Sequence, residues 1–390
     1  MPNIPFTAPD ITQEECDAVL AVMRSGWLTT GAVTAQFERE LTAFTGADGA
    51  VCVSSATTGL EAALRLCGVG AGDEVIVPAY TFSATAAAVI HVGATPVLVD
   101  CEPGSFLLSA ETVARHLTPR TAAVIPVDIG GTLCDYPAIK LVCESVCRPF
   151  SGGLIPLGRP VVIADAAHSL GSSCSSGNSG ALADFSVFSF HATKNLTTAE
   201  GGALLWKFPS ADSPAIYRTL NRSILHGQSK NAWQRNHGAT TYDIVDFGHK
   251  ANLSDLQSAI GLSQFKRYAD MLARRKAVCE TYDRMLPEDW SALRHGNQSS
   301  YHLYLALLPE QKVDQRDFLL DALRKDGICC NLHFPPLPMF SAYKNLGWNT
   351  QDFPNAMALF ARELSLPLSS LMTCQQAEAV CNQIKVLLDY

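Results

Sequence analysis

The sequence predicts an α/β protein: a mostly parallel sheet in a three-layer large domain, followed by a smaller α+β domain. Short apolar runs alternate with helix-like blocks over the first 250 residues. Strands that are apolar throughout are typical of a parallel sheet covered by helices on both faces. Beyond residue 250 a long amphipathic pattern and mixed helix–strand alternation follow. We therefore expect a large domain over residues 1–250 and a small domain over residues 251–390.

The expected strands of the large domain are short apolar runs bounded by turn residues. They are Ala50–Ser54, Glu74–Pro78, Pro96–Val99, Ala122–Pro126 and Val161–Ala164. Helical patterns centred on Leu60–Leu66 and Thr85–Val92 separate the first three runs. Strands that alternate with helices indicate βαβ units, which favour the parallel sheet.

The smaller domain is expected to open with a long amphipathic helix. Asn252–Tyr268 has the helical pattern, and the pattern continues towards Met285. Asn252 or Ser254 is the candidate N-cap, and Asp255 places an acidic side chain in the first turn.

Two further segments complete the predicted layout. Tyr301–Leu308 reads as a strand of the smaller domain, and Phe150–Pro160, rich in Gly and Pro, as a loop before a core strand. The sequence contains no internal repeat and no low-complexity tract.

Composition excludes several classes of protein. The chain has 390 residues, 47% of them hydrophobic, with 29 basic and 37 acidic side chains and a net charge of −8. These values argue against disorder, collagen or a coiled coil, and no basic run suggests a nucleic-acid partner. Neither a secretory signal nor an apolar run of about 18 residues is present, so we expect no membrane association and a cytoplasmic location.

The thirteen cysteines are scattered through the chain. Neither the spacing of Cys143 and Cys147 nor the adjacent pair Cys329 and Cys330 repeats as zinc ligands would. We expect free thiols in a reducing compartment and no metal site.

Four motifs could carry chemistry, although each has an ordinary structural explanation when taken alone. Ser54–Leu60 (SSATTGL) joins a strand to a helix and offers backbone N–H groups and hydroxyls at a positive helix end, which suits a phosphate group. Asp165 ends an apolar strand, the usual position for function in an open α/β sheet. Phe82 follows the strand Glu74–Pro78 and could stack on a flat ligand. Lys194 follows an aromatic strand, where desolvation would lower its pKa and make it a nucleophile.

Together these motifs describe a site for pyridoxal 5′-phosphate. The lysine would form a Schiff base with the cofactor aldehyde, and the acid would keep the pyridine nitrogen protonated. The phosphate motif, the aromatic side chain, the acid and the lysine all follow strands that are expected to end at one edge of the sheet.

The chain resembles the DegT/DnrJ/EryC1/StrS sugar aminotransferases, which have the aspartate aminotransferase (type I) fold. The resemblance covers nearly the whole chain, and within the family it is greatest to the enzymes that make UDP-4-amino-4-deoxy-L-arabinose. It rests on blocks that include SGWLTTG (Ser25–Gly31), SSATTGL (Ser54–Leu60), GDEVIVPAYTFSAT (Gly72–Thr85), DAAHSLGS (Asp165–Ser172), SFHATKNLTTAEGG (Ser189–Gly202), GHKANLSDLQSAIGL (Gly248–Leu262), YHLY (Tyr301–Tyr304) and LHFPPL (Leu332–Leu337).

This resemblance implies a role for each of several residues. Lys194 would be the catalytic Schiff-base lysine and proton shuttle, and Asp165 would pair with the pyridine nitrogen. The remaining implied contacts are Phe82 stacked on the ring, His168 beside it, Ala56, Thr57 and Ser189 on the phosphate, Asn252 reaching the phosphate from a neighbouring subunit, and Thr30 and His333 facing the sugar nucleotide. The same resemblance implies a homodimer with its active site at the subunit interface.

Three features depart from the family pattern. Ala164 replaces an acid that often precedes the aspartate, Asp128 stands where relatives often have histidine, and the segment Phe150–Pro160 is longer than usual. They leave the expected cofactor chemistry intact, but they weaken any assignment of a specific substrate from the family.

The expected function is transfer of an amino group from an amino acid, glutamate by preference, to a nucleotide-linked keto-sugar at C4. A C3-keto-sugar, a cyclitol ketone or a cofactor-binding regulator remains an alternative. Relatives that act as sugar dehydratases carry histidine at the position of Lys194, so this lysine argues against that activity. The absence of GxGxxG after the first strand argues against a nicotinamide-dependent dehydrogenase.

Overall fold

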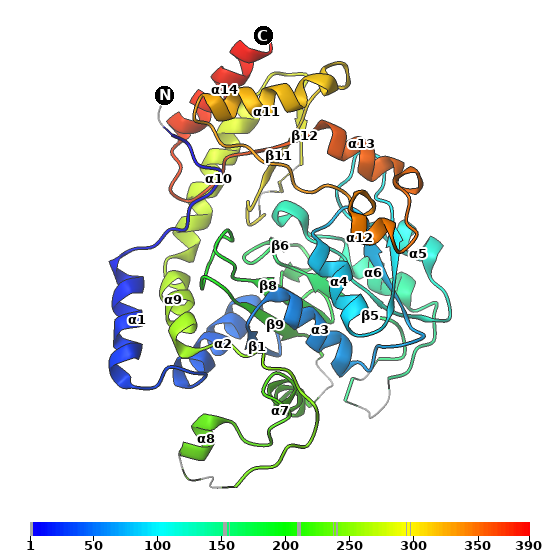
Figure 1. The fold of residues 1–390 in the computed structure, drawn as a ribbon, viewed down its shortest axis with the longest axis vertical. Helices are drawn as coiled ribbons and strands as arrows, with labels where there is room; N and C mark the ends of the chain where they lie inside the picture. The colour runs from blue at the N-terminus through cyan, green and yellow to red at the C-terminus, as the bar shows by residue number, and fades with distance from the viewer. Residues whose placement is uncertain are drawn as a thin grey trace.

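The structure is a computed structural model that describes residues 3–150, 154–155, 157–208, 212–236, 238, 241–293, 295–296 and 298–390. The expected loop Phe150–Pro160 lies partly outside these residues. A large body built on one sheet carries a smaller unit at its upper end in Figure 1, where both chain termini lie.

The large body is organised around a seven-stranded sheet in which one strand, β9, is antiparallel to the others. Its strands, in order across the sheet, are β1 (Gly49–Val53), β9 (Gly202–Trp206), β8 (Phe185–Ser189), β5 (Val161–Asp165), β4 (Thr121–Val124), β2 (Glu74–Pro78) and β3 (Thr95–Val99). The five predicted runs correspond to β1 to β5 with small differences at their ends. The mostly parallel α/β fold is therefore confirmed.

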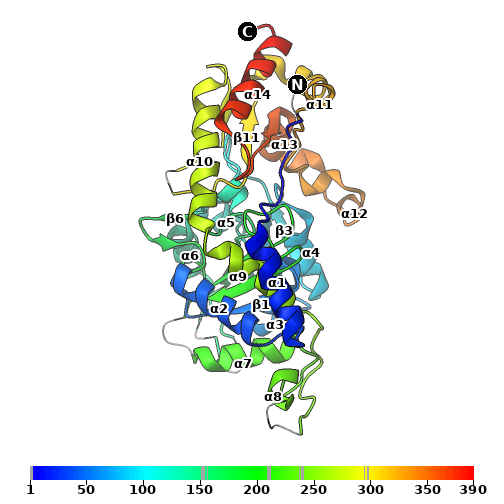
Figure 2. The same ribbon diagram turned by 90° about the vertical axis from the view of Figure 1, so that its left-hand side faces the viewer.

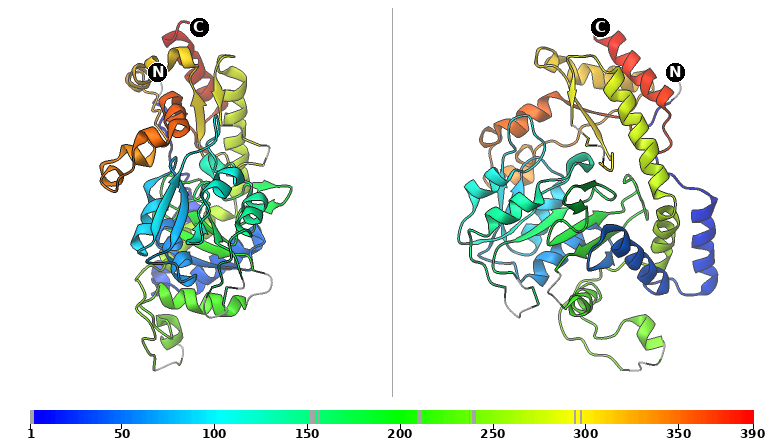
Figure 3. Two further views of the ribbon diagram at one scale, coloured as in Figure 1. Left: turned by 90° about the vertical axis from the view of Figure 1, so that its right-hand side faces the viewer. Right: turned by 180° about the vertical axis from the view of Figure 1, so that it is seen from behind.

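Helices cover both faces of this sheet, which gives the three expected layers (Figure 1 and Figure 3). One face carries α3 (Ala56–Leu66), α4 (Ser83–His91) and α7 (Ser213–Ser223). The other carries α2 (Ala32–Thr45), α5 (Ala110–His116), α6 (Tyr136–Cys143), and the start of α10 (Tyr268–Met285).

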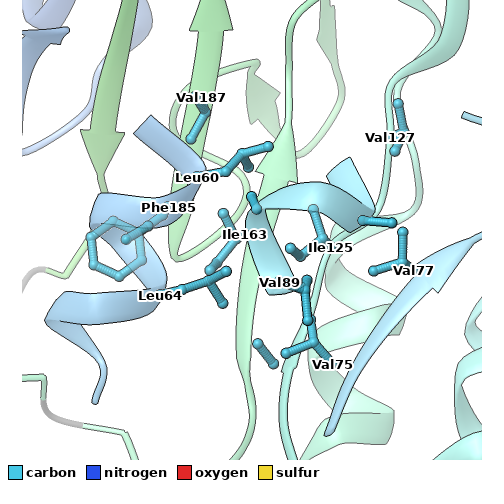
Figure 4. Close-up of a cluster of buried hydrophobic side chains, with 14 of the residues drawn as sticks. Leu60, Leu64, Val75, Val77, Val89, Ile125, Val127, Ile163, Phe185 and Val187 are labelled. Carbon is cyan, nitrogen blue, oxygen red and sulfur yellow. The ribbon is translucent and has the colours of Figure 1, made fainter. Parts of the chain in front are cut away.

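Successive side chains of a strand point to opposite faces of the sheet, which explains why both faces are apolar here. Val75 and Val77 of β2 lie in the cluster beneath α3 and α4, whereas Ile76 faces the opposite cluster. Figure 4 shows the first cluster, in which Leu60 and Leu64 of α3 meet side chains of the strands. A strand buried on both sides has no polar face, so its sequence is continuously apolar.

The smaller unit contains a three-stranded antiparallel sheet, β10–β11–β12. Its strands are β10 (Ser291–Ala292), β11 (Tyr304–Leu307) and β12 (Glu363–Leu366), and its helices are α11 (Arg316–Lys325), α12 (Ser341–Lys344), α13 (Pro354–Arg362) and α14 (Cys374–Leu387). The second half of α10 packs on α14, and Ile4 from the start of the chain joins the same core.

Four further elements complete the large body, namely α1 (Gln13–Ser25), α8 (Ala232–Asn236), and the short hairpin β6 (Ser173–Cys174) and β7 (Gly177–Asn178). Helix α1 packs against α9 (Asp255–Phe265). The segment that carries α8, residues 226–236 and 241–250, stands away from the body in Figure 1 and Figure 2, and we name it the arm.

The predicted long helix is confirmed at its start, where Ser254, one of the two candidate N-caps, is the cap, but its predicted length is wrong. The helix starts at Asp255, capped by the Ser254 side chain, while Asn252 forms an isolated bridge to Val53. It ends at Phe265, and α10 begins only at Tyr268. The interruption has a tertiary cause, because Arg267 turns to pair with two acids near the N-terminus, Asp10 at 2.9 Å and Glu15 at 3.1 Å.

The predicted strand at Tyr301–Leu308 is shorter in the structure, where β11 covers Tyr304–Leu307. All thirteen cysteines are free thiols, eight of them buried. In the described parts of the chain, every helix is too short or too polar to cross a membrane.

Candidate active site

The carboxyl ends of β1, β2, β5 and β8 meet at one edge of the sheet, because these four strands run in the same direction. A cavity of about 370 Å³ opens at this edge. The predicted residues that line it are Ala56, Thr57, Phe82, Asp165, His168, Ser189, Lys194 and His333. Ligands bind at this edge in open α/β sheets, so the structure brings together the motifs that the sequence singled out.

The N-terminus of α3 forms one wall of the cavity. Ser55 caps the helix in a capping box with Thr58, which leaves the first N–H groups, those of Ala56 and Thr57, without intrahelical acceptors. Gly202 passes so close that a Cβ there would lie 2.8 Å from the Ala56 nitrogen. The glycine therefore lets β9 approach, and the helix end keeps its positive potential for an anionic group.

Lys194 lies in the β8–β9 loop, and its neighbours hold that loop in place. The Lys194 N–H donates to His191 O at 2.9 Å. The next side chain, Asn195, donates from Nδ2 to Ser300 O at 2.7 Å, and Thr197 N–H donates to the Gln264 side chain at 2.9 Å. Burial lowers the pKa of Lys194 to about 8, although the charge of Asp165 acts in the opposite direction. The amine is therefore half-buried, fixed in position and easily deprotonated.

Asp165 ends β5 and is buried. Its Oδ2 accepts a hydrogen bond from Thr85 Oγ1 at 2.7 Å, and its Oδ1 accepts one from Ala167 N–H at 3.3 Å. Burial raises the pKa of Asp165, while these two donors and the charge of Lys194 oppose the shift. A buried carboxyl with a raised pKa gains stability from a cationic N–H partner, which is what a protonated ring nitrogen would provide.

Two histidines lie together beside Lys194. The rings of His168 and His302 are 4.3 Å apart, and both side chains are buried. His168 Nδ1 accepts the Gly130 N–H at 3.2 Å, and His302 Nδ1 lies 2.9 Å from Asn195 Oδ1. Burial lowers the pKa of both imidazoles well below the usual value. His168 therefore presents Nε2–H as a donor, whereas His302 carries its proton on Nδ1.

Phe82 is the most exposed of the predicted site residues, with 61% of its surface accessible. It precedes α4 and lies 5.8 Å from the ring of Phe334. A large apolar side chain exposed on a cavity wall is available to cover a flat ligand.

Two predicted residues, Thr30 and Asn252, do not line this cavity. Asn252 Nδ2 donates to Thr30 Oγ1 at 2.6 Å, and Asn252 also accepts a hydrogen bond from Lys250. Asp255, expected only to favour its own helix, also caps α2 by accepting the Gly31 N–H at 2.8 Å.

The residues of the site that sequence reasoning missed include Thr85, Asn195 and His302. All three lie inside quoted motifs, in FSAT, TKNL and YHLY respectively. Their position within those motifs was the available signal, but their contacts join segments distant in the sequence. Asp128, noted as a departure from the family, is buried behind Asp165 and accepts hydrogen bonds from Tyr136 and Ser169.

These residues fit pyridoxal phosphate. A helix N-terminus can hold the phosphate, a buried carboxyl the ring nitrogen, and an amine of lowered pKa the aldehyde. Among the residues that the structure describes, no group of three or more His, Cys, Asp or Glu side chains is placed to hold a metal ion.

Solved structures of known proteins superpose on nearly the whole of this chain. A putative sugar aminotransferase from Streptococcus pneumoniae, Spr1654 in its PLP-form, superposes with a TM-score of 0.94 at 38% identity, covering 99% of each chain. Its PMP-form also matches, with a TM-score of 0.94. Helicobacter pylori PseC, an aminotransferase of pseudaminic acid biosynthesis, superposes with a TM-score of 0.88 at 26% identity, covering 99% of each chain.

Sequence comparison gives the same grouping. The spore coat polysaccharide biosynthesis protein SpsC of Bacillus subtilis is 37% identical over 98% of this chain and 96% of its own length. The pattern of the DegT/DnrJ/EryC1/StrS aminotransferase family matches residues 9–385. With Lys194, Asp165 and the N-terminus of α3 on one cavity, the chain is a pyridoxal phosphate-dependent aminotransferase and belongs to the DegT/DnrJ/EryC1/StrS family.

Proposed function

We propose that this enzyme moves an amino group from glutamate to the C4 carbonyl of a nucleotide-linked keto-sugar. The observation that carries the proposal is the placement of the Lys194 amine and the Asp165 carboxyl on one cavity with the N-terminus of α3. The named relatives act in the biosynthesis of polysaccharide and of pseudaminic acid, which supports a sugar as the acceptor.

The cofactor, when bound, supplies a ring that accepts electrons from the carbon next to the transferred nitrogen. Lys194 moves the proton to and from that carbon, and its pKa of about 8 suits a group that must act as both base and acid. Asp165 would hold a proton at the ring nitrogen. Ala56, Thr57 and Ser189 would hold the phosphate.

The walls of the cavity complete these roles. Phe82, on the cavity wall, would cover one face of the ring, and His168 would offer its Nε2–H beside it. At the mouth, Thr7, Asn331 and His333 supply the polar groups that a sugar requires.

We infer that the enzyme acts as a homodimer. The arm carries exposed apolar side chains, including Tyr242, Ile244, Val245 and a 99% exposed Phe247. Such a cluster on a projecting segment is typical of a protein–protein interface. Asn252 lies at the base of the arm and does not line the cavity of its own chain, which supports its assignment to a partner's site.

The dimer is tested with Phe247→Asp, which places a charge in the proposed interface. We expect a monomer by light scattering and a loss of activity, because the partner's Asn252 is removed from the phosphate. Leu141→Asp is the matched control, since Leu141 is exposed on α6. A dimeric Phe247→Asp protein with full activity would overturn the inference.

The substrate is tested with the amino form of the cofactor, prepared from the holoenzyme and glutamate. A panel of UDP- and dTDP-linked 4-keto- and 3-keto-sugars is added, and the product is analysed by NMR. An amine at C4 is expected. An amine at C3, or reaction only with a cyclitol ketone, would contradict the proposed acceptor.

A further inference from the structure

A chain of hydrogen bonds behind the cavity connects His333 to two side chains of β12. Ser365 Oγ lies 2.9 Å from His333 Nδ1 and donates its own proton to Glu363 Oε1. The other carboxylate oxygen, Oε2, accepts the His333 backbone N–H at 3.0 Å. Glu363 and Ser365 are two residues apart on one strand, so both face the same side, and both are completely buried.

The direction of these hydrogen bonds determines which nitrogen of His333 carries the proton. Above about pH 8, where Glu363 is ionised, Ser365 donates to the Glu363 carboxylate and its oxygen is left to accept, so Nδ1 must be the donor. Nε2 of the neutral imidazole is then a bare acceptor. Burial lowers the pKa of His333 to about 4, which keeps the ring neutral.

The orientation of the ring is also fixed. Phe6 stacks on His333 with ring centroids 5.1 Å apart and an interplanar angle of 22°. The Tyr80 hydroxyl donates to His333 O at 2.7 Å. His333 lines the cavity together with Lys194 and Phe82. A preorganised side chain of this kind loses little entropy when a ligand binds.

We propose that Glu363 and Ser365 are positioning residues that hold His333 with Nε2 as a hydrogen-bond acceptor for a hydroxyl group of the keto-sugar. The proposal rests on the proposed function and extends it. An acceptor nitrogen attracts a sugar hydroxyl but repels the carboxylates of an amino-acid donor. His333 therefore serves the second half of the reaction, in which the sugar is bound, and not the first.

The isosteric variant Glu363→Gln tests this directly. A glutamine can still accept the His333 N–H through its carbonyl, while its NH₂ group must donate to Ser365. Ser365 would then donate to Nδ1, and the proton of His333 would move to Nε2. The variant keeps every buried hydrogen bond but converts the acceptor in the cavity into a donor.

The two half-reactions are measured separately at about pH 9. Burial raises the pKa of Glu363 to about 8, against the charge of Arg316, so the carboxylate is ionised at that pH. In Glu363→Gln we expect conversion of the cofactor by glutamate at the wild-type rate, but a fall of about tenfold or more in kcat/KM for the keto-sugar. Ser365→Ala should show the same split with a smaller loss.

A matched control is Glu38→Gln, the same change at a buried carboxyl outside the cavity. Glu38 accepts hydrogen bonds from Cys52 N–H and the Tyr217 hydroxyl. We expect both of its half-reactions to keep wild-type rates.

A second readout does not depend on turnover. Two-bond ¹H–¹⁵N spectra of the ¹⁵N-histidine-labelled enzyme are recorded at about pH 9, where Glu363 is ionised, and the His333 signal is identified by its loss in His333→Asn. They should show Nδ1–H in the wild type and Nε2–H in Glu363→Gln. The proposal is overturned if the tautomer is unchanged, or if both half-reactions fall equally. A wild-type amino form that reacts with no keto-sugar would instead overturn the proposed function, and the proposal with it.

Discussion

Two buried aspartates on the neighbouring parallel strands β5 and β8 have contrasting surroundings. Asp165 ends β5 at the cavity, whereas Asp184 directly precedes β8, towards the opposite edge of the sheet. Asp184 accepts two hydrogen bonds from Arg159, at 2.8 and 2.9 Å, and lies 3.4 Å from Lys140. Asp165 accepts hydrogen bonds from the neutral groups of Thr85 and Ala167.

The difference supports the proposal that Asp165 acts in function, whereas Asp184 stabilises the fold. Burial lowers the pKa of Arg159, but its hydrogen bonds and the charge of Asp184 more than reverse this effect. The Asp184 site is thus electrostatically complete without a ligand. At Asp165 burial raises the pKa, and a ligand cation would relieve that cost. Perturbed groups of this kind are typical of functional sites.

The largest effect is expected from removing the Lys194 amine, on which the proposed activity of the cavity depends. In Lys194→Ala we expect the activity to fall by about 10⁴-fold, because one side chain supplies both the covalent attachment and the proton transfer. The visible absorbance of the bound cofactor should also disappear. Turnover near the wild-type rate would refute the assignment of Lys194.

Removing the charge at the cavity edge is expected to affect catalysis and not folding. Asp165→Asn should lower kcat by about 10³-fold, since the ring nitrogen would lose the anion that keeps it protonated. The melting temperature should change little, because the only cation that acts on Asp165 is Lys194, whose lowered pKa of about 8 lets it lose its proton when the carboxylate is removed. Unchanged kcat would show that Asp165 is merely structural.

The same substitution at the other aspartate should have the opposite result. Asp184→Asn leaves Arg159 buried without a full counter-charge, so we expect a loss of about 3 kcal/mol in the free energy of unfolding. The activity of each folded molecule should stay near the wild-type value. Urea denaturation and active-site titration measure the two effects, and a stable but inactive Asp184→Asn protein would invalidate the comparison.

The pH dependence gives a smaller, graded effect. Only the neutral amine of Lys194 can react with an aldehyde, and its pKa is lowered to about 8. The rate of cofactor uptake by the cofactor-free enzyme should therefore rise about tenfold per pH unit below pH 8 and level off above it. A rate that continues to rise towards pH 10 would indicate an ordinary solvated lysine.

Regular patterns of local sequence predicted the elements of the sheet well. The continuously apolar strands β2 and β5 were found almost residue by residue, since burial on both faces dictates their composition. Phe82 and Asp165 were singled out because they lie at the ends of these two strands, whereas His168, Ser189 and His333 were found only through the resemblance to the family. The antiparallel strand β9 was not predicted, because pairing direction depends on the partner and not on the strand itself.

Tertiary contacts decided the features that local sequence could not. The helix pattern from Asn252 to Met285 is continuous, but the ion pairs of Arg267 with residues near the N-terminus interrupt it. The partners of Asn195 and of His302 likewise come from segments about a hundred residues apart along the chain. No periodicity within either segment encodes such a contact.

The sequence by itself determined the class of fold and the order of its strands along the chain, and it singled out Lys194 and Asp165 as the residues proposed to act on the cofactor. These follow from residue type and spacing, which act locally. Only the tertiary structure decided how the amine is desolvated, which aspartate lacks an ion-pairing arginine and how the Glu363–Ser365–His333 hydrogen bonds are directed. Burial and hydrogen-bond direction are properties of the assembled core, because they depend on groups that become neighbours only when the chain folds.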